Sequence, residues 1–399
     1  MHKKLLSIAL LVGVLCITSF NHASGEEKFK LAVTIPTETM LWNNGLPAPD
    51  EVWVEMIKNA EEYIYLGQFY VAEMTPSRLT PVLKELKNAS QRGVHISLMV
   101  DKKMIKYAND NEGLEFLKKI PDLEWMAIDY SKISGGAQHA KYMVVDGLEA
   151  YVGSQNFDWR SLEHIHEMGV WTSDHDTIEG LELIFLQDWL TQIELEETGG
   201  ISDYDFGSEK NCRYENHLAS SPPEQNPIGI AWSETELICL ISSANVSIDI
   251  QVMQYGPYFY NKTLYCKIDW AIREAAKRGV MVQLMVADWG TKEPWIYGLY
   301  DLATLRNVEV QVVTIPPAST GFIPFSRVIH SKYMVVDNEA LWVETGNWTG
   351  DYFVKARNIA LWLEEPKLAK QAQELFDDLW FSAYAEPVEP MCYPRVKRK

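Results

Sequence analysis

The stretch His139–Asn156, HAKYMVVDGLEAYVGSQN, decides the fold, because His330–Asn347, HSKYMVVDNEALWVETGN, repeats its pattern. In both stretches a lysine follows the histidine by two positions, an aspartate follows the lysine by five, and Ser or Thr, any residue and Asn come at the same later offset. The hexapeptide KYMVVD is identical at Lys141–Asp146 and Lys332–Asp337. A repeat of this length in one chain of 399 residues indicates internal duplication.

The sequence around the two stretches alternates between strand and helix patterns in the same order. In the first half we expect strands at Phe29–Ile35, Tyr63–Ala72, Val94–Val100 and Leu123–Ile128, and helices starting at Asp50 and spanning Pro81–Gln91 and Glu112–Lys119. In the second half we expect strands at Val246–Tyr255, Val280–Ala287 and Val308–Val313, and helices at Glu234–Ser243 and Ile268–Lys277. The pattern predicts an α/β fold of two duplicated layered domains, each a mixed β-sheet flanked by helices.

The domain boundaries follow from composition. Residues 26–205 and 206–399 are the predicted N-terminal and C-terminal domains, with a linker over Glu196–Pro227 that contains paired glycines and prolines. The chain is rich enough in apolar residues (47%) to bury a large core in each domain.

Chemistry-bearing side chains recur at a spacing of two, which places them on one face of a strand. His139 with Lys141, and His330 with Lys332, each project an imidazole and an ammonium from the start of an apolar YMVV strand. Ser154 with Asn156, and Thr345 with Asn347, are again two apart and share a face of a neighbouring strand. Each domain therefore supplies half of a site, and packing of the two domains completes it. No Cys or His spacing typical of zinc ligation occurs, so we expect no metal.

These motifs resemble the phospholipase D superfamily, whose pattern is HxKxxxxD followed by GSxN, and the duplicated pair covers nearly the whole chain after residue 25. The segments at Gly153–Gly169 and Gly346–Phe353, and the acidic-Trp ending around Asp378–Trp380, look like the branch that contains animal lysosomal phospholipase D-like 5′-exonucleases and the poxvirus nicking-joining enzyme. The resemblance implies a pseudo-twofold phospholipase D fold.

The resemblance also implies a mechanism. A neutral histidine attacks phosphorus to form a phosphohistidine, and the other, protonated histidine donates to the leaving oxygen. Lys141, Lys332, Asn156 and Asn347 hold the non-bridging oxygens, so no divalent cation is required. Glu167 lies 28 residues after His139, at the family position of a carboxylate that orients the imidazole, whereas the same offset from His330 gives Asn358. We therefore predict that Glu167 serves His139 as the nucleophile and that His330 is the general acid.

Further residues are assigned roles with structural alternatives beside them. Ser154, Thr345 and Trp348 are predicted to bind substrate. Trp159, Trp289 and Tyr352 are also candidates for base stacking, with core packing as the alternative. Asp146 and Asp337 are predicted to make structural caps or ion pairs, and His164 and His166 are given no role. Glu344, which stands where the first copy has Gly153, either narrows the pocket or points away.

The leading functional prediction is a phosphodiesterase that acts on single-stranded nucleic acid, DNA or RNA, from the 5′ end. A net charge of −19 excludes a general nucleic-acid coat protein, so phosphate must be bound in a local positive pocket. The rival with the same residues is a phospholipase or transphosphatidylase. A rival of another class is an inactive binding protein that retains the fold.

The N-terminal segment 1–25 is typical of a secretory signal peptide, with an apolar run too short for a membrane span. We expect a secreted or lysosomal-type location, no membrane span in the mature chain, and glycosylation at Asn88, Asn245 and Asn261, with Asn347 excluded by its place in the site. Cys16 is lost with the signal peptide. Cys212, Cys239, Cys266 and Cys392 are expected to form two disulfides in one of three connectivities. The resemblance suggests a homodimer.

Overall fold

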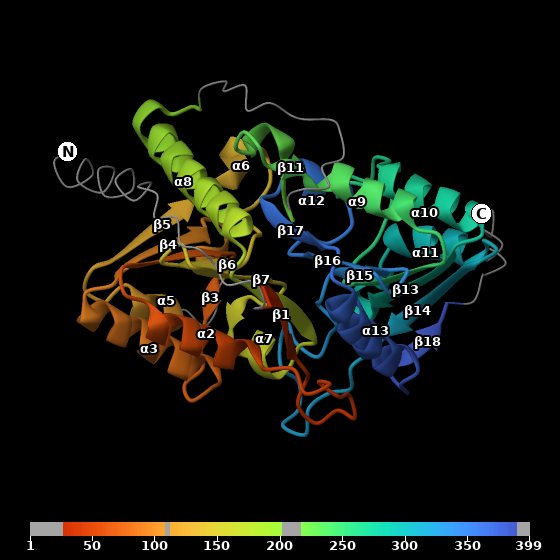
Figure 1. The fold of residues 1–399 in the computed structure, drawn as a ribbon, viewed down its shortest axis with the longest axis horizontal. Coiled ribbons are helices and arrows are strands. Elements are labelled where there is room, and N and C mark those ends of the chain that lie inside the picture. The colour runs from red at the N-terminus through yellow and green to blue at the C-terminus, as the bar shows by residue number, and fades with distance from the viewer. Residues whose placement is uncertain (1–26, 108–111, 202–216, 389–399) are drawn as a thin grey trace, which may run out of the picture.

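The computed structural model describes residues 27–107, 112–201 and 217–388, which form two β-sheets with helices packed on them (Figure 1). The first half contains β1 (Phe29–Thr34), α2 (Pro49–Asn59), β2 (Tyr63–Gln68), β3 (Val71–Ala72), α3 (Leu79–Arg92), β4 (His95–Asp101), α4 (Met104–Tyr107), α5 (Glu112–Leu117), β5 (Leu123–Ile128), α6 (Tyr130–Ile133), β6 (Tyr142–Val145), β7 (Glu149–Gly153), β8 (Phe157–Asp158), α7 (Trp159–Glu163), β9 (Glu167–Thr172) and α8 (His175–Thr198). The second contains β10 (Leu218–Ser221), the 3₁₀ turn η1 (Pro223–Gln225), β11 (Ala231–Trp232), α9 (Ser233–Ser243), β12 (Ser247–Val252), α10 (Lys267–Arg278), β13 (Met281–Ala287), the 3₁₀ turn η2 (Asp288–Thr291), α11 (Trp295–Ala303), β14 (Val308–Val313), β15 (Tyr333–Val336), β16 (Ala340–Glu344), α12 (Gly350–Val354), β17 (Asn358–Leu363), α13 (Pro366–Trp380) and β18 (Ala385–Pro387).

The two large sheets share one topology. The first has the order β1-β9-β7-β6-β2-β4-β5, and the second contains the equivalent run β10-β17-β16-β15-β12-β13-β14, with β11 and β18 added at its edges. In each half the strand that follows the His-x-Lys motif, β6 or β15, pairs antiparallel with the first strand of a parallel run. Mixed pairing and a repeated strand order confirm the predicted duplicated α/β fold.

The helices that lead into β4 and β13 end in the same way. Gly93 and Gly279 take φ values of 98° and 102°, in the left-handed region where glycine carries no Cβ penalty. The preceding residues, Arg92 and Arg278, donate hydrogen bonds to carbonyl groups at the C-terminal end of the helix before, α2 or α9. The predicted glycine stop signals are confirmed.

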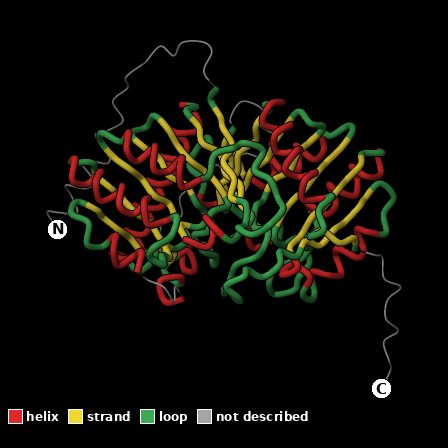
Figure 2. Tube along the Cα trace, turned by 90° about the horizontal axis from the view of Figure 1, so that it is seen from below, coloured by secondary structure: helices red, strands yellow, loops and turns green. Residues whose placement is uncertain are grey.

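Apolar side chains fill three layers. One cluster lies between the first sheet and the helices α2, α3 and α5, and a second lies between the second sheet and α9, α10 and α11. The third lies between the two halves, where α8 and α13 cover the inner faces of their sheets. Figure 2 shows the two similar halves side by side, with their strands meeting in the middle of the molecule. The two repeated stretches, His139–Asn156 and His330–Asn347, end in this central layer.

Several predicted boundaries differ from the structure. The expected strand Tyr63–Ala72 is split into β2 and β3, and α2 begins at Pro49, so that Ala48 and not Asp50 is its N-cap. The expected linker Glu196–Pro227 contains β10, which pairs with β17 inside the second sheet. The predicted domain boundary at 205 and 206 lies outside the described residues, as does the segment 1–25.

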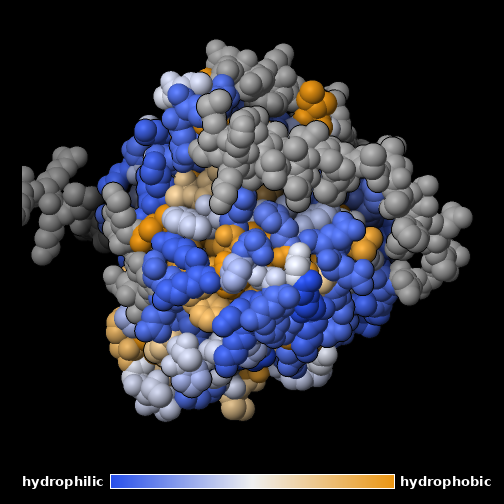
Figure 3. All heavy atoms as spheres, turned by 90° about the vertical axis from the view of Figure 1, so that its left-hand side faces the viewer, coloured by the Kyte–Doolittle hydropathy of each residue, from blue (hydrophilic) through white to orange (hydrophobic). Residues whose placement is uncertain are grey.

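The cysteine prediction is also corrected. Cys239 takes part in a disulfide, but Cys266 carries a free thiol, so the predicted pair of disulfides that uses all four cysteines is wrong. Cys16, Cys212 and Cys392 lie outside the described residues. Within the described residues we find no helix that has both the length and the apolarity to cross a membrane. The face shown in Figure 3 carries mostly hydrophilic residues.

Candidate active site

Both His-x-Lys pairs lie at the entrance to a buried strand, where the two halves meet. His139 and Lys141 lie just before β6, His330 and Lys332 lie just before β15, and all four side chains are buried. Burial lowers the pKa of His139 well below its usual value, and the nearby charges of Lys141, Lys332 and His330 lower it further. The two pairs therefore form one electrostatic cluster.

Each histidine-bearing loop is held by the opposite half. The backbone N–H of His139 donates to Arg357 O at 2.9 Å, and that of His330 donates to His166 O at 2.8 Å. Arg357 and His166 are equivalent residues of the two halves, because each directly precedes the first residue of a strand, β17 or β9. The two loops therefore reach their final positions only when the halves are packed together.

The imidazoles have different partners across this interface. Nδ1 of His330 lies 2.9 Å from both carboxylate oxygens of Glu167, whereas Nδ1 of His139 lies 3.0 Å from Oδ1 of Asn358. The prediction that Glu167 orients His139 is wrong, because β9 places the Glu167 carboxylate against the histidine of the other half. In both cases an oxygen accepts the Nδ1–H and leaves Nε2 available for chemistry.

Ser154 and Thr345 form hydrogen bonds behind these partners, which favours a positioning role over the predicted substrate contact. The Thr345 hydroxyl donates to Asn358 Oδ1 at 3.1 Å and accepts from the Ile359 N–H at 3.0 Å. The Ser154 hydroxyl exchanges hydrogen bonds of 3.1 Å with the Met168 backbone and helps to lower the pKa of Glu167. Both hydroxyls are fully buried. Ser154 helps to position Glu167 and Thr345 helps to position Asn358, and these two residues in turn orient the histidines.

The two lysines are buried cations. Each ammonium donates to the carbonyl oxygen of its own histidine, and neither forms a salt bridge among the described residues. Burial lowers the pKa of Lys332 to about 7, and burial together with Lys332 lowers the pKa of Lys141 well below its usual value. A bound anion would stabilise the charged form of both lysines and raise their pKa again, so this pair favours an anionic ligand.

Asn156 and Asn347 occupy equivalent turns beside the lysines. Their backbone carbonyls accept from Asp158 N at 2.7 Å and Thr349 N at 3.1 Å. Both side chains are buried, and Oδ1 of each lacks a hydrogen-bond partner within the described parts of the chain. The electrostatic contacts thus bring the two histidines and the two lysines together, and the place of Asn156 and Asn347 in the same site stays a prediction.

The charge state of the His330 pair follows from burial. Burial raises the pKa of Glu167 to about 7, against the lowering effect of Lys332, and burial with both lysines lowers the pKa of His330 well below its usual value. The pair therefore holds a single proton under mildly acidic conditions, and Nε2 of His330 keeps its lone pair. Such an imidazole is suited to nucleophilic attack.

Of the aromatic candidates, Tyr352 alone contacts a histidine of the site. Trp348 and Trp159 are buried in the two outer cores, which favours the core-packing alternative for both, and the substrate contact of Trp348 stays a prediction. Trp289 is partly exposed on η2. The Tyr352 ring lies edge-on to His139, at 4.9 Å between centroids.

The aspartates of the repeat act as structural caps, as predicted. Asp146 accepts hydrogen bonds from the N–H groups of residues 61–63 at the start of β2, and Asp337 accepts from those of residues 245–247 at the start of β12. Burial alone would raise the pKa of Asp337, but these donors hold it below its usual value.

Glu344 is fully buried, and its carboxylate lies close enough to Lys332 for the two groups to interact electrostatically. Its carboxylate accepts from the Trp342 indole at 3.3 Å, and burial raises its pKa to about 8.

The predicted glycan acceptors Asn88, Asn245 and Asn261 are exposed, whereas Asn347 is buried.

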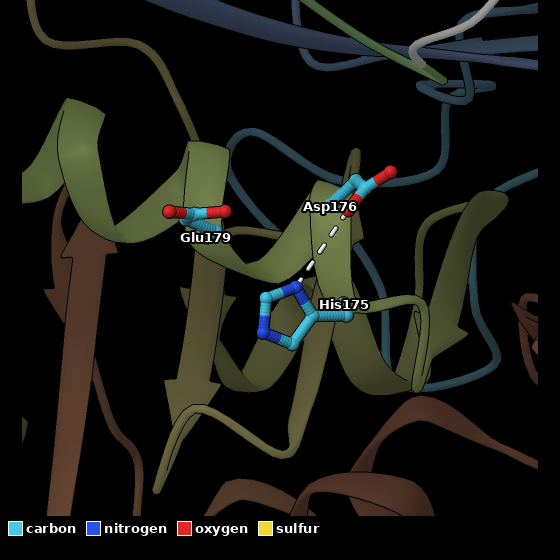
Figure 4. A group of neighbouring side chains, drawn as sticks. All are labelled: His175, Asp176 and Glu179. Atoms are coloured by element: carbon cyan, nitrogen blue, oxygen red, sulfur yellow. Dashed lines mark ion pairs between the residues drawn. The ribbon is translucent and has the colours of Figure 1, made fainter. Parts of the chain in front are cut away.

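The described residues contain one group with metal-ligand spacing, and it lies outside this cluster. His175, Asp176 and Glu179 occupy the exposed first turn of α8, with His175 Nδ1 and Asp176 Oδ1 3.6 Å apart (Figure 4). Exposed acidic groups of this kind are common on helix surfaces and carry no assignment.

A duplicated α/β fold that brings one His-Lys motif from each half to a pseudo-twofold interface defines a class of enzymes that cleave or transfer phosphoryl groups. A family model described as cardiolipin synthase, PLD-like domain, matches residues 53–189 and 237–380, which is more than half of the chain. The chain belongs to the phospholipase D superfamily, and its chemistry is that of a phosphodiesterase.

Relatives of two kinds match most of the chain. Phospholipase D Z of Dictyostelium discoideum is 29% identical over 388 residues, which cover 90% of each chain. The 5′-3′ exonuclease PLD3 of Xenopus laevis is 27% identical over 400 residues, covering 90% of this chain and 80% of the relative. Both support the family branch that the motifs predicted.

Solved structures confirm the fold. The phosphatidylserine synthase of Haemophilus influenzae aligns with a TM-score of 0.58 at 12% identity, covering 85% of each chain. The polyphosphate kinase of Porphyromonas gingivalis aligns with a TM-score of 0.54 at 15% identity, covering 91% of this chain and 48% of its own. At these identities the similarity concerns the fold alone.

Proposed function

We propose that the chain is a metal-independent phosphodiesterase that removes nucleotides from the 5′ end of single-stranded DNA or RNA through a phosphohistidine intermediate. The observation that carries the proposal is the pair of buried histidines with unlike Nδ1 partners, Glu167 and Asn358, beside two buried lysines. The similarity to the Xenopus exonuclease supports nucleic acid as the substrate.

We propose roles for the two histidines opposite to those predicted from the sequence, and the contacts of Nδ1 with Glu167 and Asn358 support this assignment. Nε2 of His330 attacks phosphorus, the bond from phosphorus to the leaving oxygen breaks, and the Glu167 carboxylate stabilises the positive charge that develops on the phosphorylated imidazole. His139 donates its proton to the leaving oxygen, because the neutral amide of Asn358 gives an imidazolium less stabilisation and makes it the stronger acid.

The second step uses the same groups in reverse. His139 accepts a proton from water, water attacks phosphorus, and the bond between phosphorus and Nε2 of His330 breaks. Lys141, Lys332, Asn156 and Asn347 hold the non-bridging oxygens in both steps, where charge spreads in the transition state.

The second candidate is a phospholipase D that acts on a phospholipid headgroup. The similarity to the Dictyostelium phospholipase D Z favours it, and the same residues serve either substrate. A test uses end-labelled single-stranded DNA and phosphatidylcholine vesicles, both with EDTA. We expect nucleotide release from the DNA without added metal; turnover of the lipid alone would overturn the nuclease assignment.

Trapping the intermediate tests the reversed roles. Rapid quenching at alkaline pH preserves the phosphorus–nitrogen bond, and peptide mapping locates it. We expect the adduct on His330 and none in a His330→Ala variant. An adduct on His139 would contradict the assignment, and loss of all activity in both His→Ala variants would exclude an inactive binding protein.

We also propose a secretory or lysosomal-type location and a homodimer. The signal-like segment 1–25 and the exposed sequons at Asn88, Asn245 and Asn261 support the location. Endoglycosidase treatment of protein from a eukaryotic secretory host, followed by mass measurement, checks the glycans, and light scattering checks the dimer.

A further inference from the structure

Two aromatic rings contact His139, whereas among the described residues no ring contact to His330 is found. The His139 ring lies 4.8 Å from Phe69 and 4.9 Å from Tyr352, between centroids. Within the described part of the chain, no comparable ring contact involves His330, whose Nδ1 faces Glu167. The two sides of the site therefore differ in chemical character.

The aromatic surface continues outward from Tyr352. The Tyr260 hydroxyl donates to the Tyr352 hydroxyl at 3.2 Å, and the Tyr260 ring packs edge-on against Trp295 at 5.7 Å. Tyr260 is 48% exposed, and Tyr352 and Trp295 are half-buried. We refer to Tyr352, Tyr260 and Trp295 as the aromatic wall, which leads from His139 to the solvent.

The aromatic wall is fixed in place by its backbone. The segment after β12 is hydrogen-bonded to the chain around α12, with Gly256 N donating to Trp348 O at 3.0 Å and Gly350 N to Tyr258 O at 3.2 Å. The Tyr260 N–H donates to the Asp351 carboxylate at 2.5 Å. A rigid surface of this kind loses little conformational entropy when it binds a ligand.

The repeat itself shows that the aromatic wall is specific to one half. Ser161 and Tyr352 are equivalent, because each lies five residues after the site asparagine, Asn156 or Asn347. Ser161 lies close enough to Glu167 to help lower the pKa of that carboxyl group, whereas Tyr352 places a ring on His139. Tyr260, which contacts Tyr352 in the aromatic wall, is half exposed. Packing in a buried core therefore does not explain why aromatic residues are found in this half.

We infer that the aromatic wall binds the nucleobase of the nucleotide that departs without the phosphate. The inference rests on the proposed function and on His139 as the acid for the leaving oxygen, because the group attached to that oxygen then lies beside Tyr352 and Tyr260. Flat rings with hydroxyl groups at their rim suit a stacked base better than an acyl chain, and stacking tolerates any base.

The test compares single-stranded oligonucleotides that differ only by an abasic residue at the first or the second position from the 5′ end. Product analysis identifies which of the two nucleotides departs without the phosphate. We expect the abasic residue to slow release about tenfold at that position and to have little effect at the other, because base stacking contributes on this scale.

Three variants complete the experiment. Tyr260→Ala is expected to abolish the difference between the intact and abasic substrates, whereas Tyr260→Phe keeps the ring and the preference. Trp270→Ala removes an exposed aromatic side chain of α10 outside the aromatic wall and serves as the matched control.

The possible outcomes separate the two proposals. Nucleotide release with no abasic effect in the wild type, or an abasic effect that survives Tyr260→Ala, overturns the aromatic wall and leaves the nuclease assignment standing. No release from any oligonucleotide, with turnover of phosphatidylcholine, overturns the proposed function itself.

Discussion

The two histidines of the site differ in the group that faces Nδ1, which is a carboxylate for one and an amide for the other. A carboxylate oxygen of Glu167 faces His330 and an amide oxygen of Asn358 faces His139, at 2.9 and 3.0 Å. A carboxylate stabilises an adjacent imidazolium far more than an amide does, because it adds a charge to the hydrogen bond. This difference separates a nucleophile from an acid within one pseudo-symmetric site.

Asn358→Asp is expected to raise the pKa of His139, because a carboxylate within hydrogen-bond reach stabilises the protonated imidazole by about 1–3 pKa units. In the wild type, burial and the neighbouring cations lower that pKa, so kcat/KM falls as pH rises from acidic toward neutral. The variant should move this decline to higher pH. Measurement of kcat/KM between pH 4 and 8 checks the shift.

The exchange has a structural cost that is measured separately. Asn358 Nδ2 donates to Tyr352 O at 2.9 Å, and aspartate loses this bond, so the free energy of unfolding should fall by about 1–3 kcal/mol. Asn358→Ala loses the same bond without adding charge and is the control. A pH profile of Asn358→Asp that matches the wild type would contradict the role of His139 as the acid.

Sequence alone identified the six His, Lys and Asn residues, because a spacing of two on a strand fixes which side chains share a face. It did not identify the partners of the histidines. The offset of 28 residues correctly selected Glu167 and Asn358, but an offset along the chain contains no information about contacts across the pseudo-twofold interface.

At the scale of secondary-structure elements, the turn from β16 to α12 requires a glycine at 346. A Cβ there would lie 2.9 Å from Asn358 Cγ and 3.0 Å from its Oδ1. Gly346→Ala should therefore displace the amide from His139 and lower kcat about 100-fold, since small misplacements of catalytic groups have effects of this size.

The matched control is Gly200→Ala, where a Cβ meets nothing within 4 Å and φ is not positive. Circular dichroism at 222 nm is expected to show both variants folded at 25 °C. Full activity in Gly346→Ala would show that the position of Asn358 does not matter to catalysis.

The contact between β12 and α13 contains a buried carboxyl group. Burial, and next the charge of Asp377, raises the pKa of Asp249 to about 7. The folded state thus binds a proton that the unfolded state releases near pH 4, so this group destabilises the protein increasingly as pH rises from about 4 to 7. Asp249→Asn removes that penalty.

We therefore expect Asp249→Asn to raise Tm at pH 8 and to leave it nearly unchanged at pH 4. Thermal unfolding of both proteins at the two pH values checks the sign. Equal differences at pH 4 and pH 8 would show that folding does not raise the pKa of Asp249.

The long helix α8 shows why some elements escape sequence analysis. The buried face of α8 includes Asp188 and Gln192 among apolar residues. These polar residues interrupt the apolar periodicity that indicates a helix. The split between β2 and β3 was missed for another reason, because the apolar and aromatic residues on both sides of Gly67 and Gln68 make Tyr63–Ala72 resemble one strand and conceal the break at Phe69 and Tyr70.

At the scale of the whole molecule, the buried ion pair of Arg357 and Asp188 joins the two halves. Arg357 donates to both Asp188 carboxylate oxygens, at 2.9 and 2.8 Å, and to Tyr130 at 2.8 Å, and it also donates to carbonyl groups of the segment around η1. Asp188→Asn leaves a buried guanidinium without its countercharge, so the free energy of unfolding should fall by about 3–5 kcal/mol.

Activity should fall as well, because Arg357 O holds the His139 backbone. Urea denaturation at pH 5.5 gives the change in stability. The double variant Asp188→Leu with Arg357→Met removes both charges and is expected to be more stable than Asp188→Asn. A double variant less stable than the single one would show that the network contributes more than charge compensation.

At this scale, sequence predicted the duplication and the mixed sheets, because KYMVVD and the strand order repeat. The crossed contacts of Arg357 and His166 had no signal in the sequence. They depend on how two sheets pack, and residue spacing within one half does not determine that packing.

The crossed partnership has a consequence for how such a protein arises by evolution. In an assembly of two identical chains, any substitution appears twice, so both histidines would always face the same residue. Once the gene for one half is doubled and fused, each copy mutates independently, and one position can hold Glu167 while its counterpart holds Asn358. Fusion is thus what permits two chemically distinct histidines to descend from one ancestral sequence.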